Sequence, residues 1–464
     1  MSNSDNTLTV TAADDMAEIA VMDGSLNVIA KGIGKFQQSL PQGIYKIRVR
    51  VGPTVEQTLV SLDKNVQLDF RAFKIPSPIP LDASTVGNPV HAGAAIEASR
   101  TVKDSFGTGA SVLVFAREQS GERNPQTSNP AAGLSFVNEN GQQLADIAQR
   151  AEVRLGPDAC AGWRADLDPG PYRLRLARPD GSTVERAVYA SRDNQVQIFL
   201  LQCDFTVSDG DCATTRMADM SGSAISIATH QEFSPQNERT RLSEIARYAL
   251  TQRRRILSDA FLDNLLDAKF DDPMLGLLGA HLLLRDKPNE AGLFKIVSDN
   301  LVRLLGPDHP DVRALLLARE DSGNFGRRLG SPPMLRASWD LGVEHSIRYP
   351  SILSMASPES AIADKIMSDA PWLIWRMPFG DGLSTAERTI KDYLGARIRA
   401  ETWRAQAVPR SMLGRLSATF NDLVGRKPTA APATPLDADE KADLSRTLGL
   451  PDQVLKSMLE KLSR

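Results

Sequence analysis

The chain has 464 residues, and its 54 lysines and arginines nearly balance its 57 aspartates and glutamates, so the formal net charge is −3 at pH 7. This balance excludes the general electrostatic attraction to nucleic acid or to an acidic membrane that a strongly basic chain has. The apolar fraction of 42% is typical of a globular protein, and the length predicts about three domains.

The first residues, the apolar runs and the cysteines indicate the cellular location of the protein. Residues 1–6 contain neither a basic segment nor an apolar stretch, so no secretory signal is expected. The longest apolar run, residues 275–284, is too short to span a bilayer. The sparse, odd-numbered cysteines favour a reducing compartment, with Cys203 either paired to Cys212 or, like Cys160, a free thiol. We therefore expect a cytoplasmic protein without a membrane span.

The first half of the chain contains a repeat. Residues 39–51 and 166–176 share Leu-x-x-Gly-x-Tyr followed by alternating apolar and basic residues. Further on, Thr-Val-Glu at 54–56 matches 183–185, and Val-Gln-Leu at 66–68 resembles Val-Gln-Ile at 196–198. A repeat of this length predicts two copies of one module. The positions that match at a constant offset of 127 residues are Leu40 with Leu167, Gly43 with Gly170, Tyr45 with Tyr172 and Arg48 with Arg175.

Each copy is predicted to be an antiparallel β-sandwich. In residues 45–51 apolar side chains alternate with cations, and a period of two is typical of a half-buried strand. Short strands separated by Gly, Pro, Asn and Asp favour a sandwich. Module 1 then covers residues 1–71 and module 2 residues 110–201. The other expected strands are 8–11, 17–22, 26–30, 54–61, 66–70, 111–117, 133–138, 151–155, 184–190 and 196–201.

These motifs resemble PEGA-type and carboxypeptidase-regulatory-like modules over residues 8–70 and 110–201. The resemblance implies small β-sandwiches that act as spacers and binding surfaces and carry no catalytic residues of their own. Such modules are commonly exported, whereas this chain shows no export signal.

Two segments are predicted to connect the modules. Residues 72–109 include the proline-rich stretch 75–80, which should be extended and stiff, so we expect an extended linker there. Residues 202–238 are small and polar, which favours a hinge.

A helical domain is predicted for residues 239–426, because apolar residues there recur at steps of three and four. Expected helices include a buried one at 275–284, one at 293–305 that ends at Gly306, and one starting at Pro310. Others should begin at 357–359, at the capping box 384–387 and at Pro409. This domain is expected to fold independently of the sandwiches, which makes the fold class multidomain β plus α.

The chain ends with a predicted linker and a helical pair. Residues 427–436 are rich in Pro and Ala, and residues 437–464 should form two short helices around Gly449. Their apolar face is too large for so few residues to bury alone, so it either binds a partner or packs on the chain's own helices. The candidate partner-binding residues on this face are Leu448, Val454, Leu455, Met458, Leu459 and Leu462.

Trp372 and Trp375 are two further candidates. The aromatic sequence 372–375 could anchor a partner or fill the core, as large aromatics usually do.

Residues able to carry chemistry are few. Cys160 lies in Asp-Ala-Cys-Ala-Gly with His91 upstream, which superficially matches a caspase-type Cys–His pair. The charged residues at 150–154 do not suit the buried parallel strand that such a site needs, and Gly162-Trp163 aligns with residues 35–36 of module 1. No metal-ligand spacing, cofactor motif or phosphate-binding loop is found, and the run Arg253–Arg255 is interpreted as a salt-bridged helix face. We therefore expect no enzyme activity, metal, cofactor or nucleic-acid partner.

The sequence thus favours a non-catalytic adaptor or scaffold that binds other proteins through its β modules and helical domain. One alternative is a regulatory subunit of a separately encoded effector, such as a protease or a nucleotide-driven enzyme, in a bacterial multi-protein system. The other is a hydrolase that uses Cys160 and His91.

Overall fold

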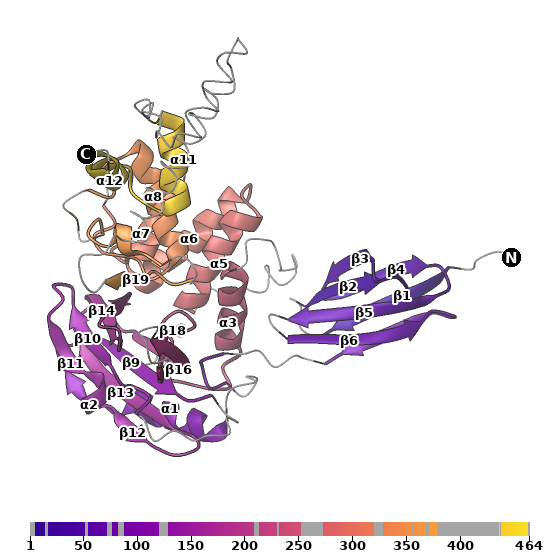
Figure 1. The fold of residues 1–464 in the computed structure, drawn as a ribbon, viewed down its shortest axis with the longest axis horizontal. Helices are drawn as coiled ribbons and strands as arrows, with labels where there is room; N and C mark the ends of the chain where they lie inside the picture. The colour runs from indigo at the N-terminus through magenta and orange to yellow at the C-terminus, as the bar shows by residue number, and fades with distance from the viewer. Residues whose placement is uncertain are drawn as a thin grey trace, which may run out of the picture.

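The computed structural model confirms a multidomain combination of β-sheets and α-helices (Figure 1). Figure 1 shows an N-terminal β module that stands apart from a larger body of sheets and helices. The structure describes residues 5–13, 17–51, 54–71, 77–81, 88–119, 129–207, 213–229, 232–251, 272–319, 328–354, 357, 359–367, 371–377, 436 and 438–462.

Module 1 is a single seven-stranded sheet. Its strands are β1 (Asn6–Ala12), β2 (Glu18–Met22), β3 (Val28–Ile33), β4 (Lys35–Leu40), β5 (Ile44–Val51), β6 (Thr54–Ser61) and β7 (Val66–Phe70). Their order is β6-β5-β2-β3-β4-β1-β7, and β7 lies parallel to β1. One residue pair, Ile33 with Lys35, joins β3 to β4, so the sheet has two halves held together by a narrow connection.

The alternating sequence of β5 explains the core of module 1. Tyr45, Ile47 and Val49 are buried, whereas Lys46 and Arg48 between them lie on the opposite face. Side chains of the other half of the sheet join the same apolar cluster. Those of β1 and β4 are Leu8, Val10, Ala12, Phe36 and Leu40.

Module 2 contains two sheets. Its strands are β8 (Asp104–Ser105), β9 (Ala110–Arg117), β10 (Leu134–Asn138), β11 (Gln143–Asp146), β12 (Glu152–Arg154), β13 (Cys160–Leu167), β14 (Gly170–Ala177), β15 (Thr183–Ala190), β16 (Gln195–Val207), β17 (Ala213–Ala218), β18 (Ala224–Ala228) and β19 (Ile374–Met377). One sheet has the order β11-β10-β14-β15-β19 and the other β12-β13-β9-β16-β17, with β18 paired to β16 and β8 to β13. Phe136 and Trp163, whose ring centroids lie 5.4 Å apart, connect the inner faces of the two sheets.

The two modules share one strand order. In module 1, β1 pairs with β4 and β7, and β5 pairs with β2 and β6. In module 2, β9 pairs in the same way with β13 and β16, and β14 with β10 and β15. The same register shift follows Val21 in β2 and Phe136 in β10. The repeat in the sequence therefore corresponds to a repeated arrangement of strands.

A hydrogen bond explains why the shared motif contains glycine and tyrosine. The Tyr45 hydroxyl donates to the carbonyl of Pro41 at 2.7 Å, and the Tyr172 hydroxyl donates to the carbonyl of Asp168 at 2.9 Å. In both modules the acceptor lies four residues earlier, on the other side of the turn. This bond fastens the turn to the strand, as the tyrosine corner does in Greek-key sandwiches. Tyr45 and Tyr172 thus occupy equivalent positions.

The Thr-Val-Glu match, in contrast, is out of register by one residue. Tyr45 pairs with Val60 and Tyr172 pairs with Val188, so Val60 corresponds to Val188. A slip by one residue turns a side chain to the other face of a sheet. For this reason Val55 is 43% exposed, although the Val184 aligned with it by sequence is fully buried.

The predicted linker and hinge are both structured, which corrects those two boundaries. Within 72–109 the structure contains α1 (Pro89–Arg100) and β8, and Ile79 is buried in the same cluster as Phe115 of β9. Within 202–238 it contains the end of β16, β17 and β18. The small and polar composition led to the wrong prediction of a hinge. Such residues, for example the buried Ser226, also form strands that other elements cover.

The region predicted to be all-helical includes strand β19, so that prediction is wrong in this respect. Its helices are α3 (Glu238–Thr251), α5 (Pro273–Asp286), α6 (Ala291–Leu305), α7 (Pro310–Leu317), α8 (Arg336–Arg348) and the short η1 (Ala363–Lys365). The expected buried helix at 275–284 is confirmed as α5, and α6 ends at Gly306, where φ is +88°. Residues 384–387 and 409–424 lie outside the described residues. Around residue 359 the chain forms turns and η1 rather than an α-helix.

Module 2 and the helices share a core, so the prediction of an independent helical unit is also wrong. β19 pairs antiparallel with β15, and α3 and α5 pack on β18. The Asn194 amide after β15 donates to the carbonyl of Leu304 in α6 at 3.4 Å. On the opposite side of the module, α1 packs on β9 and β13. These helices therefore pack on the sheet that contains β13, β9, β16 and β18, and Figure 1 shows them around it.

The packing of α1 gives a testable prediction. A Cβ atom at Gly162 in β13 would lie 2.5 Å from the Ala98 Cβ of α1. Gly162→Ala should therefore push α1 away and lower the free energy of unfolding by about 1–3 kcal/mol in chemical denaturation.

Gly93→Ala is the matched control. Gly93 lies on the exposed side of the same helix, and a Cβ there meets no atom within 4 Å. This variant should raise stability by about 0.5–1 kcal/mol, because alanine favours the helix. Equal effects of the two substitutions would contradict the observed packing.

Candidate functional site

The C-terminal helical pair is packed against this chain. It consists of α11 (Ala438–Leu448) and α12 (Asp452–Leu462), as predicted. The Trp339 indole N–H of α8 donates to the carbonyl of Gly449 at 2.8 Å, and Trp339 is fully buried. Val454, Leu455 and Met458 belong to the same apolar cluster as Trp339. The interpretation of this stripe as an open docking element is therefore wrong, because α8 covers it.

The remaining stripe residues follow the same pattern where they are described. Leu448 and Leu459 are partly buried against this cluster. The side chain of Leu462 lies outside the described residues. The apolar face that the sequence left without a partner is thus mostly an internal contact.

The contribution of this contact to stability is measurable. Leu455 is 1% exposed, so Leu455→Ala should lower the free energy of unfolding of the full chain by about 2–4 kcal/mol. Lys456 is exposed on the same helix, and Lys456→Ala should change it by less than about 0.5 kcal/mol. Denaturant unfolding that shows no difference between the two variants would contradict a docked tail.

Trp372 and Trp375 also lie inside the protein, and both are fully buried. The Trp372 indole N–H donates to the carbonyl of Ser223 at 2.6 Å, and the Trp375 indole N–H donates to Glu185 Oε2 at 3.1 Å. These bonds fix β19 and the residues before it against module 2. The two tryptophans therefore fill the core and present no surface to a partner.

Arg186 of β15 is a buried cation that the sequence analysis missed. Its guanidinium lies 5.0 Å from the centre of the Trp372 ring and donates to the Ser223 hydroxyl. Its Nε and Nη2 have no hydrogen-bond partner within the described residues. Burial, reinforced by the nearby charge of Arg247, lowers the pKa of Arg186 to about 9. Neither of the two pockets described below is lined by Arg186. We therefore interpret Arg186 as a structural residue rather than a binding residue.

The candidate pair Cys160 and His91 does not form an activated nucleophile. Cys160 is 2% exposed, and burial raises the pKa of its thiol to about 11. Burial, with the nearby charge of Arg117, lowers the pKa of His91 to about 4. A reactive cysteine needs a lowered thiol pKa and access to solvent, and both conditions are missing here.

Thiol labelling tests this assignment. With iodoacetamide near pH 7.5, Cys160 should react at least about ten times more slowly than the exposed Cys203, as read by mass spectrometry of the labelled peptides. In denaturant the two rates should become similar. Faster labelling of Cys160 in the native protein would indicate an activated thiol and would revive the hydrolase hypothesis.

A buried polar network joins α5, α7 and α8. His281 Nε2 and the Ser338 hydroxyl are 2.8 Å apart, and Ser338 also bonds to Asp311. The Asp311 carboxylate accepts the backbone N–H groups of Met334 and Leu335 at 2.9 Å each. Burial raises the pKa of Asp311 to about 6 and lowers that of His281 to about 3.

This network contains serine, histidine and aspartate but has no catalytic geometry. Asp311 contacts Ser338 instead of orienting the histidine, and none of the three side chains is more than 5% exposed. Its physical effect is to provide hydrogen-bond acceptors for the backbone N–H groups that precede α8. Within the described part of the chain no three His, Cys, Asp or Glu side chains could hold a metal ion. None of the described helices is long and apolar enough to cross a membrane.

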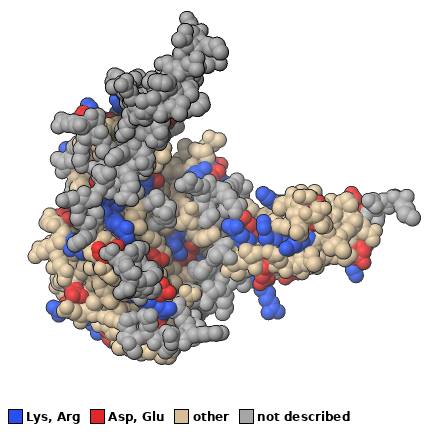
Figure 2. Space-filling view, viewed as in Figure 1, with Lys and Arg blue, Asp and Glu red and all other residues tan. Residues whose placement is uncertain are grey.

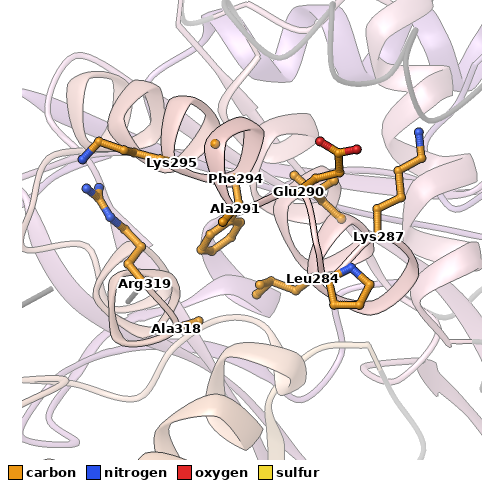
Figure 3. Close-up of a pocket in the computed structure, with 11 residues that line it drawn as sticks. Leu284, Lys287, Glu290, Ala291, Phe294, Lys295, Ala318 and Arg319 are labelled. Carbon is orange, nitrogen blue, oxygen red and sulfur yellow. The ribbon is translucent and has the colours of Figure 1, made fainter. Parts of the chain in front are cut away.

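A pocket of about 300 Å³ lies where α5, α6 and the end of α7 meet. Figure 3 shows Phe294 between Lys295 and Arg319 on one side and Glu290 and Lys287 on the other. Arg319 pairs with Asp299 at 2.6 Å, and the two lysines also have polar contacts within the chain. The cations around this pocket are therefore engaged by the protein itself.

A second, more polar pocket of about 430 Å³ lies where β18 meets α3 and α5. Asp272 lines it, and its carboxylate accepts the Leu275 N–H at 2.9 Å, which caps α5. Burial raises the pKa of Asp272 to about 6. Arg239 and Arg303 also line this pocket and have contacts within the chain. The residues present serve the helix ends and do not define a ligand.

Among the described residues, the two most exposed large apolar side chains lie on the outer side of β5 and β6, here named the open face. Leu59 is 71% exposed and Ile44 64% exposed, which is unusual for large aliphatic side chains in strands. Figure 2 shows Lys and Arg atoms gathered along module 1 over β5. The open face consists of Ile44, Lys46, Arg48, Arg50, Val55, Gln57 and Leu59.

The corresponding face of module 2 is neutralised by an acid. Arg175 Nε donates to Glu185 Oε1 at 2.7 Å, and Arg173 Nη1 lies 3.5 Å from Glu185 Oε2. Trp375 of β19 covers this cluster, and the Arg173 guanidinium lies 5.8 Å from its ring centre. One carboxylate thus balances two arginines under a covering strand.

Module 1 has the same cations without the acid. Lys46 and Arg48 correspond to Arg173 and Arg175, and Gln57 stands opposite Arg48 as Glu185 stands opposite Arg175. No ion pair of Lys46 or Arg48 occurs within the described residues. Across β2, Glu18 stands opposite Arg50, whereas Arg48 and Lys46 face Ala20 and Met22. Within the described residues, Lys46 and Arg48 therefore have no carboxylate opposite them on either neighbouring strand.

Comparisons with known proteins identify no relative. No protein-family model matches the chain, and no curated protein matches its sequence. Among solved structures, the Bacillus anthracis TIE protein has a TM-score of 0.15 and 12% identity over 40% of this chain and 32% of that chain. The N-terminal eight Ig domains of Down Syndrome Cell Adhesion Molecule isoform 1.30.30 have a TM-score of 0.12 and 10% identity over 48% and 36%.

This chain thus spans about a third of the length of each of these two structures. TM-scores this low carry no argument about its fold or function.

The sequence did contain a signal for the open face. The strict alternation of residues 45–51 showed that Lys46 and Arg48 lie on one side of β5. What a linear alignment could not show was the one-residue shift between β6 and β15, which places Gln57 opposite Arg48.

Proposed function

We propose that the protein is a non-catalytic adaptor in which module 1 is the binding head and module 2 with its helices is the supporting body. In this proposal the two modules are tandem copies of one β-sandwich, and only the second has been covered by other parts of the chain. The observation that carries the proposal is the open face, which combines strongly exposed Leu59 and Ile44 with Lys46 and Arg48, two cations without an opposite carboxylate within the described residues.

The body supports this division of roles. Helices pack on its β9–β16 sheet, and the tryptophans and the apolar side chains of the tail helices that could have offered binding surfaces are mostly buried. The buried Cys160 thiol and the enclosed Ser338 network argue against a hydrolytic site. Module 1 is left as the part of the described chain with an exposed apolar and charged sheet face.

Co-purification tests the adaptor function. The tagged full-length protein, isolated from its native host, should carry a companion protein in near-equal molar amount. Leu59→Lys should remove most of this companion, because a charge replaces an apolar contact. Leu155→Lys is the matched control, since Leu155 is 59% exposed but lies in module 2.

Three results would separate the hypotheses. A companion lost with both variants or with neither would contradict module 1 as the binding head. A companion that is itself a protease or a nucleotide-hydrolysing enzyme would favour the regulatory-subunit alternative. Turnover by the isolated chain would overturn the non-catalytic assignment.

A further inference from the structure

We propose that the edge of β6 binds an extended segment of another protein, with alternating acidic and aliphatic side chains, as an added antiparallel strand. The inference rests on the proposed adaptor function and specifies how its partner is recognised. It is built on a comparison between the two modules of this chain.

Module 2 shows what the equivalent edge does. β15 corresponds to β6, and β19, which is almost two hundred residues away in the sequence, pairs antiparallel with β15. Thr183 faces Met377 and Glu185 faces Trp375 in this pairing. The fold therefore already accepts an extended segment at this edge, and it does so with a strand of only four residues.

The backbone of β6 is oriented for the same pairing. The Leu62 N–H donates to the Gly43 carbonyl at 2.8 Å, so residues alternate from this pair onward between bonding β5 and pointing away from it. Val55, Gln57 and Leu59 fall on the positions that point away. Within the described residues β6 pairs only with β5 and ends the sheet. Its outward N–H and C=O groups can therefore form a ladder with an incoming strand.

Charge specifies the partner. Lys46 and Arg48 lack the carboxylate that Glu185 supplies to the corresponding arginines of module 2, because Gln57 is neutral. An incoming strand with acidic residues on this side would supply that charge from outside. The methylene groups of these acidic side chains would lie against Leu59. The aliphatic residues that alternate with them would cover the edge of the apolar core on the other face.

A second copy of this chain fits the edge less well. Two β6 strands pairing with each other would place Val55, Gln57 and Leu59 opposite one another and would bring no carboxylate to Lys46 or Arg48. The cations of both copies would instead add to one sheet face that has no carboxylate opposite Lys46 or Arg48. The acidic partner strand is therefore the occupant that we assign.

Fluorescence anisotropy with the full-length protein tests the assignment. The probe is a fluorophore-labelled, end-blocked peptide Glu-Val-Glu-Ile-Glu-Val-Glu, compared with Lys-Val-Lys-Ile-Lys-Val-Lys. The acidic peptide should bind more tightly by at least about tenfold, and the difference should shrink as salt is added.

Two variants address the two parts of the proposal. Gln57→Glu supplies the missing acid within the chain, so it should weaken binding of the acidic peptide about tenfold without destabilising the fold. Gln37→Glu is its control, because Gln37 is exposed on β4 of the same module and the net charge changes equally. Leu59→Pro removes one outward N–H and should abolish binding, and circular dichroism checks that the module remains folded.

The peptide and variant measurements test charge, strand addition and the identity of the occupant separately. Equal binding of both peptides, or equal effects of Gln57→Glu and Gln37→Glu, would overturn the role of charge. Unchanged binding after Leu59→Pro would overturn strand addition, and self-association that this variant abolishes would show that a second copy is the occupant. A companion protein lost with Leu59→Lys but retained with Leu59→Pro would keep the adaptor function while rejecting strand addition.

Discussion

The pairing of β19 with β15 is the contact on which the organisation of the larger body depends. It brings residues 371–377 from the helical part of the chain onto the edge of a sheet formed by residues 134–190. Trp372, just before this short strand, and Trp375, within it, then belong to two different buried apolar clusters. Without this pairing β15 would be an open edge. Helices α7 and α8 would also lose one of their connections to module 2.

The same edge explains how two copies of one strand arrangement come to differ. In module 2 the edge is covered, and Glu185 under the covering strand neutralises two arginines. In module 1 no described strand pairs with the outer edge of β6, the equivalent position is Gln57, and Lys46 and Arg48 are partly exposed. An open edge is a liability for aggregation unless charged side chains protect it. Lys46 and Arg48 thus both protect the edge against other copies and select an acidic strand.

Buried polar contacts keep segments that are distant in the sequence in place within the body. The Ser77 hydroxyl donates to Glu244 of α3 at 2.6 Å, and Arg117 of β9 donates to the carbonyls of Ser77 and Pro78 at 3.0 Å each. Asp311 of α7 similarly bonds the start of α8. Groups buried this deeply are costly when unpaired, so each bond restricts the chain to one arrangement. These contacts explain why segments with the composition of a linker are folded onto module 2.

The sequence by itself determined the repeat, the period of two in β5, the equivalent tyrosines, and helices such as α5, α6 and the C-terminal pair. These features depend on neighbours along the chain, where turns, alternation and helix ends leave a local pattern. The equivalence of Phe36 in module 1 and Trp163 in module 2 also followed from the alignment.

Only the tertiary structure decided that α8 covers the apolar stripe of Leu455, that residues 374–377 form a strand, and that Gln57 is the counterpart of Glu185. A short apolar segment such as 372–375 carries no local signal that separates a strand from a helix or a surface anchor. Its state depends on the open edge of β15, which lies far away in the sequence. Likewise, loop lengths set the register between β5 and β6, and a shift of one residue reverses which side chains are buried.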